Sequence, residues 1–223
     1  MITLGIETAT QVVGVAIAGD DGVLGQVEVV QGRRHAETLT PAIQFLCRHL
    51  RIELGQIGAI GVDIGPGLFT GMRVGIASAK TMAQALQVPV VGVSSLDLLA
   101  YPYRHATKVI ASVIDARKAE VFYALYKASP GGVQRVAEPT VGSIDDFNAD
   151  VMARGQDVLA VGDGAWRYRS ELDPGVEVVE LAHPSAAALV QLARAKALRM
   201  DASEDVQPMY LRAPDAQINW SSR

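Results

Sequence analysis

Apolar and polar positions follow two kinds of pattern along this chain, and the patterns recur in two halves. Short apolar runs between turn residues predict strands, whereas apolar residues three and four positions apart predict amphipathic helices. In the first half, strands are predicted at 2–8, 12–18, 23–30, 58–64 and 88–93, and helices at 35–50, 71–86 and about 95–101. After residue 102 the pattern restarts, with strands at 109–114, 121–126, 158–161 and 176–181 and a helix at 185–200.

The order of these elements indicates the fold class. Each half opens with hairpin-linked strands and continues with alternating helix and strand, which is typical of an α/β protein. A chain of 223 residues, 49% hydrophobic and 20% charged, can form one large domain or two small lobes. We therefore predict two similar lobes, residues 1–103 and residues 104–223.

Composition narrows the range of functions. With 20 basic and 24 acidic residues the net charge is −4, so the chain alone is not expected to grip nucleic acid. The single cysteine, Cys47, excludes an internal disulfide and a multi-cysteine zinc site. Neither a signal peptide nor a bilayer-length apolar run is evident, so we expect a cytoplasmic protein. The four histidines form no pair at helical ligand spacing, so no metal site is expected, and solvated or partner-facing histidines are favoured.

The segment 65–75 lies between a predicted strand and a predicted helix and contains four glycines and a proline. Glycine lets a backbone approach another group closely, and free N–H groups converge at a helix N-terminus. The group approached could be a phosphate or another stretch of backbone, and the sequence leaves both open. We expect Thr70 to cap the helix.

Three further loops carry polar or glycine residues at strand ends. Glu7 and the threonines after it can hold a phosphate and its metal, or can form a tight turn that bonds its own backbone. Asp115 stands at the equivalent place in the second half. The candidates for phosphate or nucleotide binding are Glu7, Thr8, Thr10, Gly65, Gly67, Asp115 and Gly162. There is no P-loop lysine pattern, so a Walker-type site is not expected.

The predicted helix 71–86 has small residues at every fourth position, which let another element come close. They could pack within the chain against the helix 35–50 or form an interface with a second subunit. The helix 35–50 is apolar on more than one side, Phe45 included, so it could serve both a core and a partner. The candidate interface residues are Leu39, Ala42, Ile43, Leu46, Gly71, Gly75, Ala79 and Ala83.

Five segments together resemble one known family, the bacterial TsaB (YeaZ) proteins. In chain order they are Ile6-Glu7-Thr8-Ala9-Thr10, Gly65-Pro66-Gly67-Leu68-Phe69-Thr70-Gly71-Met72-Arg73-Val74-Gly75, Gly92-Val93-Ser94-Ser95-Leu96, Ile114-Asp115-Ala116-Arg117 and Tyr210-Leu211-Arg212. The resemblance covers nearly the whole chain. It implies the actin/Hsp70/sugar-kinase (ASKHA) fold, an α/β fold of two RNase H-like lobes.

The resemblance also implies a function. With TsaD, TsaE and TsaC, members of the family help to install threonylcarbamoyl on the adenosine beside the anticodon of tRNAs that read codons starting with A. TsaD transfers the group, and TsaB is a required, non-catalytic partner that docks through two N-lobe helices, here 35–50 and 71–86. We therefore expect a scaffold that contacts TsaD directly, TsaE within the complex and tRNA only through the complex. A homodimer is an option for the free chain.

Departures from the catalytic paralogue favour this non-catalytic role. The metal-binding histidine pair of TsaD has no counterpart in 92–99, and Glu7 stands where ASKHA phosphotransferases usually carry aspartate. No cofactor is expected to be required, although ATP or ADP could bind in or near the complex interface. The alternative is an independent ASKHA ATPase or phosphotransferase in which Glu7 and Asp115 hold a metal-bound nucleotide. A third possible function is that of a metallopeptidase, but the four histidines lack the spacing of a metal site.

Overall fold

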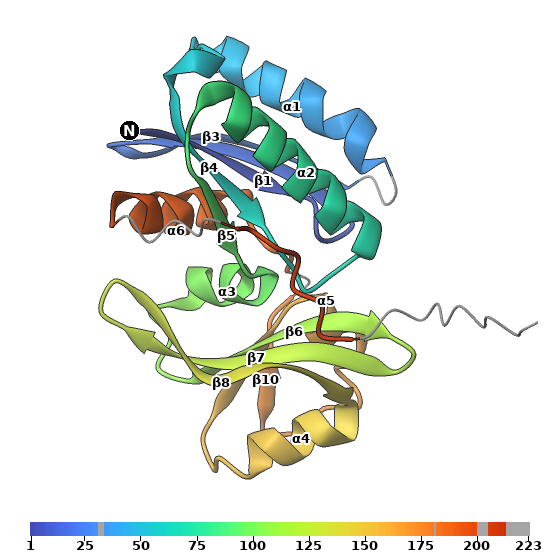
Figure 1. Cartoon of the computed structure of the whole chain (residues 1–223). Coiled ribbons are helices and arrows are strands. Elements are labelled where there is room, and N and C mark those ends of the chain that lie inside the picture. The colour runs from blue at the N-terminus through green and yellow to red at the C-terminus, as the bar shows by residue number, and fades with distance from the viewer. Residues whose placement is uncertain (31–33, 181, 200–204, 213–223) are drawn as a thin grey trace, which may run out of the picture.

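The structure is a computed structural model that describes residues 1–30, 34–180, 182–199 and 205–212. Its first sheet has the strand order β3-β2-β1-β4-β5 (Figure 1). β1, β2 and β3 are antiparallel neighbours, whereas β4 and β5 run parallel to β1. The strands are β1 (Ile2–Glu7), β2 (Val12–Gly19), β3 (Gly22–Val30), β4 (Ile57–Asp63) and β5 (Val90–Val93).

The second sheet repeats this arrangement in the order β10-β9-β6-β7-β8. Three antiparallel strands again come first, and two parallel strands follow beside the first of them. Its strands are β6 (Val109–Arg117), β7 (Glu120–Ser129), β8 (Gly132–Ser143), β9 (Val158–Val161) and β10 (Val176–Val178). The predicted pair of RNase H-like lobes is thus confirmed, and β8 is a strand that the sequence analysis missed.

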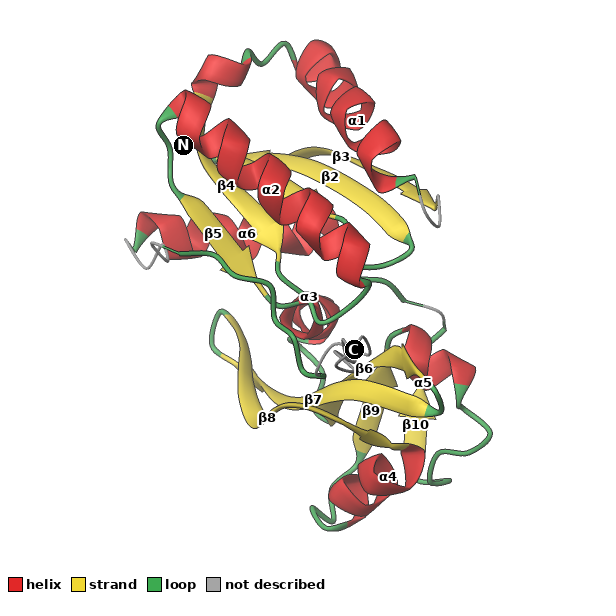
Figure 2. Cartoon of the chain, turned by 45° about the vertical axis from the view of Figure 1, so that its right-hand side comes forward, coloured by secondary structure: helices red, strands yellow, loops and turns green. Residues whose placement is uncertain are grey.

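Helices cover both faces of the first sheet. α1 (His35–Leu50) and α2 (Phe69–Leu86) lie on one face and α6 (Ala186–Leu198) on the other (Figure 2). α6 follows the second sheet in the chain, but it packs against β1, β2 and β4. By its contacts, segment 186–198 therefore belongs with the first lobe rather than with the C-terminal lobe to which we assigned it.

Small residues make this packing close. A Cβ at Gly5 would lie 2.6 Å from Val190 Cγ1, and a Cβ at Gly61 would lie 2.5 Å from the Cβ of Ala193. Bare backbone on β1 and β4 thus faces an alanine-rich helix.

Among the residues that the structure describes, none of the helices combines the length and the hydropathy of a membrane span.

α3 (Ser95–Ala100) lies between the two lobes. The side chain of Ser94 caps it by accepting from the Leu96 N–H. Leu96 and Leu99 pack into a cluster with Ile110 of the second sheet, and the Ser112 hydroxyl donates to the Leu96 carbonyl over 2.7 Å. α3 is therefore fixed against the second sheet and connects the two lobes. The remaining elements are η1 (Leu54–Gln56), η2 (Tyr101–Tyr103), α4 (Ile144–Met152) and α5 (Asp163–Arg167).

Candidate functional site

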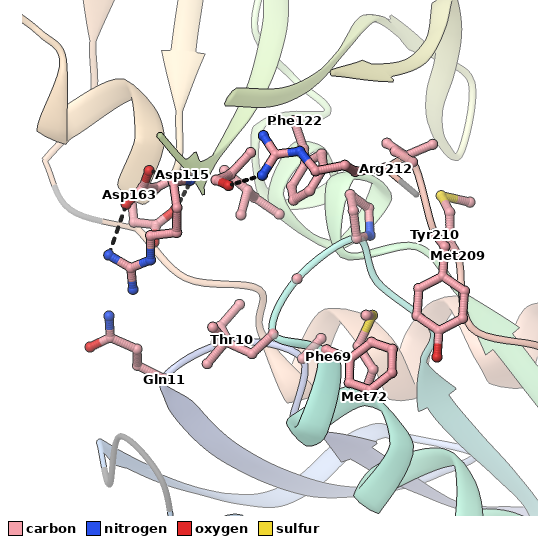
Figure 3. Close-up of a pocket in the computed structure, with 18 of the residues that line it drawn as sticks. Thr10, Gln11, Phe69, Met72, Asp115, Phe122, Asp163, Met209, Tyr210 and Arg212 are labelled. Atoms are coloured by element: carbon pink, nitrogen blue, oxygen red, sulfur yellow. Dashed lines mark hydrogen bonds and ion pairs between the residues drawn. The ribbon is translucent and has the colours of Figure 1, made fainter. Parts of the chain in front are cut away.

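A cleft of about 450 Å³ opens between the lobes. Five segments line it: the turn after β1, residues 66–72 around the start of α2, the β6–β7 hairpin, Asp163 at the start of α5 and residues 209–212. Figure 3 shows the labelled lining residues around the hollow, among them Thr10, Gln11, Phe69, Met72, Asp115, Phe122, Asp163, Met209, Tyr210 and Arg212. Tyr210, Leu211 and Arg212 entered the sequence analysis as part of a family resemblance, but no place in a site was predicted for them.

The structure brings only part of the predicted phosphate set to this cleft. Thr10, Gly67 and Asp115 line it. Glu7 and Thr8 are fully buried. Gly65 and Gly162 have positive φ values of +96° and +116°, which favour glycine. A Cβ at Gly162 would also lie 2.2 Å from the Val113 carbonyl oxygen.

The glycine segment approaches backbone. A Cβ at Gly67 would lie 2.1 Å from the Ala9 carbonyl oxygen, and one at Gly71 would lie 2.1 Å from that of Thr8. The Leu68 N–H, at the start of α2, donates to the Ala9 carbonyl over 2.6 Å. Of the two alternatives left open, close approach of two backbones is therefore the one observed. Thr70 is not the cap, because α2 begins at Phe69 after Leu68.

Thr8 and His35 reinforce the same junction. The Thr8 hydroxyl donates to the Gly71 carbonyl over 2.8 Å. Nε2 of His35 lies 2.7 Å from the Thr10 carbonyl oxygen, which can only accept, so this nitrogen donates. His35 is buried at 5% exposure, so a solvated or partner-facing role is wrong for this histidine. The spacing of the histidines could not reveal this role, because the hydrogen-bond partner of His35 is Thr10, 25 residues away in the sequence.

The eight predicted interface residues lie inside the chain. Six of them are at most 6% exposed, and Gly71 and Gly75 are buried as well. The small-residue stripe faces the sheet and the β1–β2 turn, and α2 contacts β4 more than it contacts α1. The assignment to a partner surface is therefore corrected: Leu39, Ala42, Ile43, Leu46, Gly71, Gly75, Ala79 and Ala83 form or border the first lobe's own core.

Glu7 and Asp63 form a pair of buried carboxylates. They end β1 and β4, which are parallel neighbours in the sheet. Oε1 of Glu7 accepts from the Ala9 N–H over 2.9 Å and the Thr10 N–H over 3.2 Å. Oδ1 of Asp63 accepts from the Gly65 N–H over 2.8 Å and the Ser95 hydroxyl over 2.7 Å. Oε2 of Glu7 and Oδ2 of Asp63 have no hydrogen-bond partner among the described residues.

Burial dominates the acid–base behaviour of this pair. It raises the pKa of Asp63 to about 7, against the hydrogen bonds from Ser95 and Gly65. It also raises the pKa of Glu7 well above the usual range, and the nearby Asp63 charge adds to the effect. The sequence analysis did not single out Asp63, although an acidic residue at the end of an apolar strand was a visible signal.

Asp115 organises the β6–β7 hairpin at the edge of the cleft. Its Oδ1 accepts from the Arg117 N–H over 2.9 Å, and its Oδ2 pairs with the Arg117 guanidinium over 3.1 Å. These bonds hold a hairpin in which Arg117, Lys118 and Ala119 all have left-handed φ, of 64°, 56° and 60°. The Asp115 carboxylate is thus engaged within the chain. No group of three or more potential metal ligands occurs within the described ranges.

Comparison with known proteins covers nearly the full length of the chain. A family model described as TsaD, tRNA N6-adenosine threonylcarbamoyltransferase, matches residues 22–220. The tRNA threonylcarbamoyladenosine biosynthesis protein TsaB of Bacillus subtilis is 26% identical over 229 residues, covering 99% of this chain and 98% of its own.

Solved structures support the same relationship. YeaZ from Pseudomonas aeruginosa matches with a TM-score of 0.82 and 28% identity, covering 94% of this chain and 99% of the other. Component A of (R)-2-hydroxyglutaryl-CoA dehydratase from Acidaminococcus fermentans has a TM-score of 0.50 at 11% identity, covering 89% of this chain and 99% of its own. That likeness concerns the fold alone, and the fold is that of the ASKHA proteins. With matches in sequence and structure over almost its full length, the chain belongs to the TsaB (YeaZ) family.

Proposed function

We propose that this protein is a non-catalytic subunit in the formation of threonylcarbamoyladenosine in tRNA. In this proposal it docks to a TsaD protein through the outward faces of α1 and α2, meets TsaE in the assembled complex and reaches tRNA only there. It works in the cytoplasm and requires no cofactor of its own. Membership of the TsaB family and the names of its relatives support a role in this tRNA modification pathway. The composition of the exposed face of α2 supports docking to TsaD.

The outward face of α2 is exposed and almost free of charge. Its exposed helical positions are Phe69, Thr70, Arg73, Ala77, Thr81, Gln84 and Ala85, of which only Arg73 is charged. A surface helix ordinarily carries charged residues on its solvent side, whereas the core of a protein interface is depleted of them. This face therefore has the composition of an interface.

α1 continues this surface with an aromatic pair. Phe45 is 50% exposed, and its ring centroid lies 4.1 Å from that of His49. Exposed aromatic side chains are enriched among residues that anchor protein interfaces. The partner surface that we propose thus uses the outward residues of the two helices, while their inward residues form the core.

The state of the carboxylates supports a non-catalytic role. Glu7 is fully buried, and Asp115 is ion-paired with Arg117 and lies 3.7 Å from Arg167. Neither is arranged to hold a metal-bound nucleotide. The cleft of about 450 Å³ is the observation that favours the alternative, an ASKHA ATPase. Sustained ATP hydrolysis by the pure chain, lost in Asp115→Asn, would support that alternative.

We expect Ala77→Arg to weaken binding to the same organism's TsaD at least about tenfold, which corresponds to roughly 1.4 kcal/mol. Ala77 lies in the middle of the exposed face of α2. On docking, a guanidinium at this position would lose its water without gaining an acidic partner, and burying an unpaired charge costs free energy. Size-exclusion chromatography with light scattering identifies the wild-type complex, and calorimetric titration gives the two affinities.

Ala153→Arg is the matched control, because Ala153 is exposed at the C-terminal end of α4 in the other lobe. It should leave the affinity unchanged. Equal affinities for Ala77→Arg and wild type would remove α2 from the interface. If wild type formed no complex with TsaD, even with TsaE and ATP present, the scaffold proposal itself would be lost.

A further inference from the structure

Residues 205–212 form an extended segment, here called the C-terminal strap, that runs from the first lobe to the second. In Figure 1 it is the red, non-helical stretch that descends from beside β5 towards the end of β6. Its last four residues line the cleft. The strap belongs to no strand or helix. Hydrogen bonds of its backbone and side chains to both lobes fix its position.

Its attachment to the first lobe is extensive. Val206 is 4% exposed and belongs to the core of the first lobe. The Met209 N–H donates to the Ile64 carbonyl over 2.7 Å. The Tyr210 hydroxyl accepts from Nε of Arg73 over 2.9 Å, and the ring of Tyr210 stacks on Phe69 with centroids 5.5 Å apart. An apolar anchor, a backbone bond and an aromatic stack therefore hold the strap on this side.

The polar attachment to the second lobe is concentrated on Arg212. Its Nη1 donates to the Ala116 carbonyl over 2.9 Å, and its guanidinium forms an ion pair with Glu120. Both partners belong to the β6–β7 hairpin, Ala116 near the end of β6 and Glu120 at the start of β7. The side chain of Arg212 is 25% exposed, so water can compete for these bonds. The two ends of the strap thus differ in strength.

The lobes have a separate connection through α3, which packs against β6, β7 and β8. A connection through a packed helix can act as a hinge, whereas one that depends on a single partly exposed side chain can open. We propose that the C-terminal strap is a latch that fixes the opening of the cleft, with α3 as the hinge and Arg212 as the point of release. The latch operates in the free chain and needs no partner, so its test is independent of the docking proposal.

The test measures the separation of the lobes directly. Spin labels are placed at Thr81→Cys on α2 and Lys127→Cys on β7, both exposed positions, in a Cys47→Ala background. Double electron–electron resonance should give one narrow distance distribution for this labelled protein. Arg212→Gln should broaden the distribution and shift it to longer separations, and Glu120→Gln should do the same.

Asp205→Asn is the matched control. It breaks the ion pair of Asp205 with Lys80 over 3.0 Å, which ties the strap to α2 within the first lobe, and it should leave the distribution unchanged. An unchanged distribution in Arg212→Gln would overturn the latch. Hydrogen exchange of the Met209 amide gives a second readout: retained protection in Arg212→Gln supports release at the second lobe, and lost protection would overturn Arg212 as the point of release.

Discussion

Gly71→Ala is expected to destabilise the free chain by about 2–3 kcal/mol, although alanine is the better helix former. The added Cβ would lie 2.1 Å from the Thr8 carbonyl oxygen and 3.3 Å from Nε2 of His35. α2 would have to move away from the β1–β2 turn and so weaken the hydrogen bond from Thr8 to the Gly71 carbonyl. The gain in helix propensity, about 0.5–1 kcal/mol, offsets only part of this cost.

Urea unfolding followed by circular dichroism measures the effect. Gly55→Ala is the matched control, because a Cβ at Gly55 would meet nothing within 4 Å, and it should change the free energy of unfolding by no more than about 0.5 kcal/mol. The result also separates two roles for the small-residue stripe. A glycine needed only by a partner would tolerate alanine in the free chain, so wild-type stability in Gly71→Ala would contradict the close backbone approach.

Local patterns predicted the elements well. α1 spans the predicted range 35–50, because Leu39, Ile43 and Leu46 recur at helical spacing and are all buried on the sheet. The strands of the β1–β2, β2–β3 and β6–β7 hairpins were also predicted, since their apolar runs are bounded by turn residues. β8 was missed because most of its positions are partly buried, so it shows no alternation between apolar and polar residues.

Local patterns could not predict which element packs against a given helix face or strand end. The spacing of Gly71 and Gly75 shows that a helix face lacks bulk, but not whether a sheet, a helix or a second subunit covers it. The pairing of Glu7 with Asp63 depends on the parallel contact of β1 with β4, which no local pattern encodes. The position of α6 on the first sheet is likewise a property of the whole fold.

The Glu7–Asp63 pair is expected to make the stability of the chain fall as the pH rises from about 5 to about 8. An aspartate usually titrates near pH 4, and in the folded chain burial raises the pKa of Asp63 to about 7. Between these values the folded state holds a proton that the unfolded state has released. The stabilisation is therefore complete below the unfolded pKa and is lost as the pH passes through the folded one.

For one carboxyl whose pKa moves from about 4 to about 7, the whole loss is roughly 4 kcal/mol, of which about 2–3 kcal/mol falls between pH 5 and 8. Burial also raises the pKa of Asp163, so this carboxylate adds to the same fall. The carboxylates with lowered pKa values act in a different range. The pKa values of Asp20, Asp146 and Asp205 are lowered by hydrogen bonds, chiefly from the N-terminal amine, Ser143 and Gln207 respectively. Their contribution is lost in acid, below the usual pKa of aspartate, so it does not mask a fall between about pH 5 and 8.

Asp63→Asn is expected to remove the part of this pH dependence that Asp63 contributes, while that of Glu7 remains, and to make the chain more stable than wild type at about pH 8. The remaining amide oxygen can still accept from the Gly65 N–H and the Ser95 hydroxyl, and the uncharged group escapes the cost of burying an anion. Urea unfolding at several pH values measures the slope. Glu37→Gln, which neutralises an exposed acid on α1, is the control and should follow wild type. A wild-type stability that stayed level or rose over this range would show that the buried pair is ionised in the folded chain, because only a retained proton makes stability decrease as the pH rises.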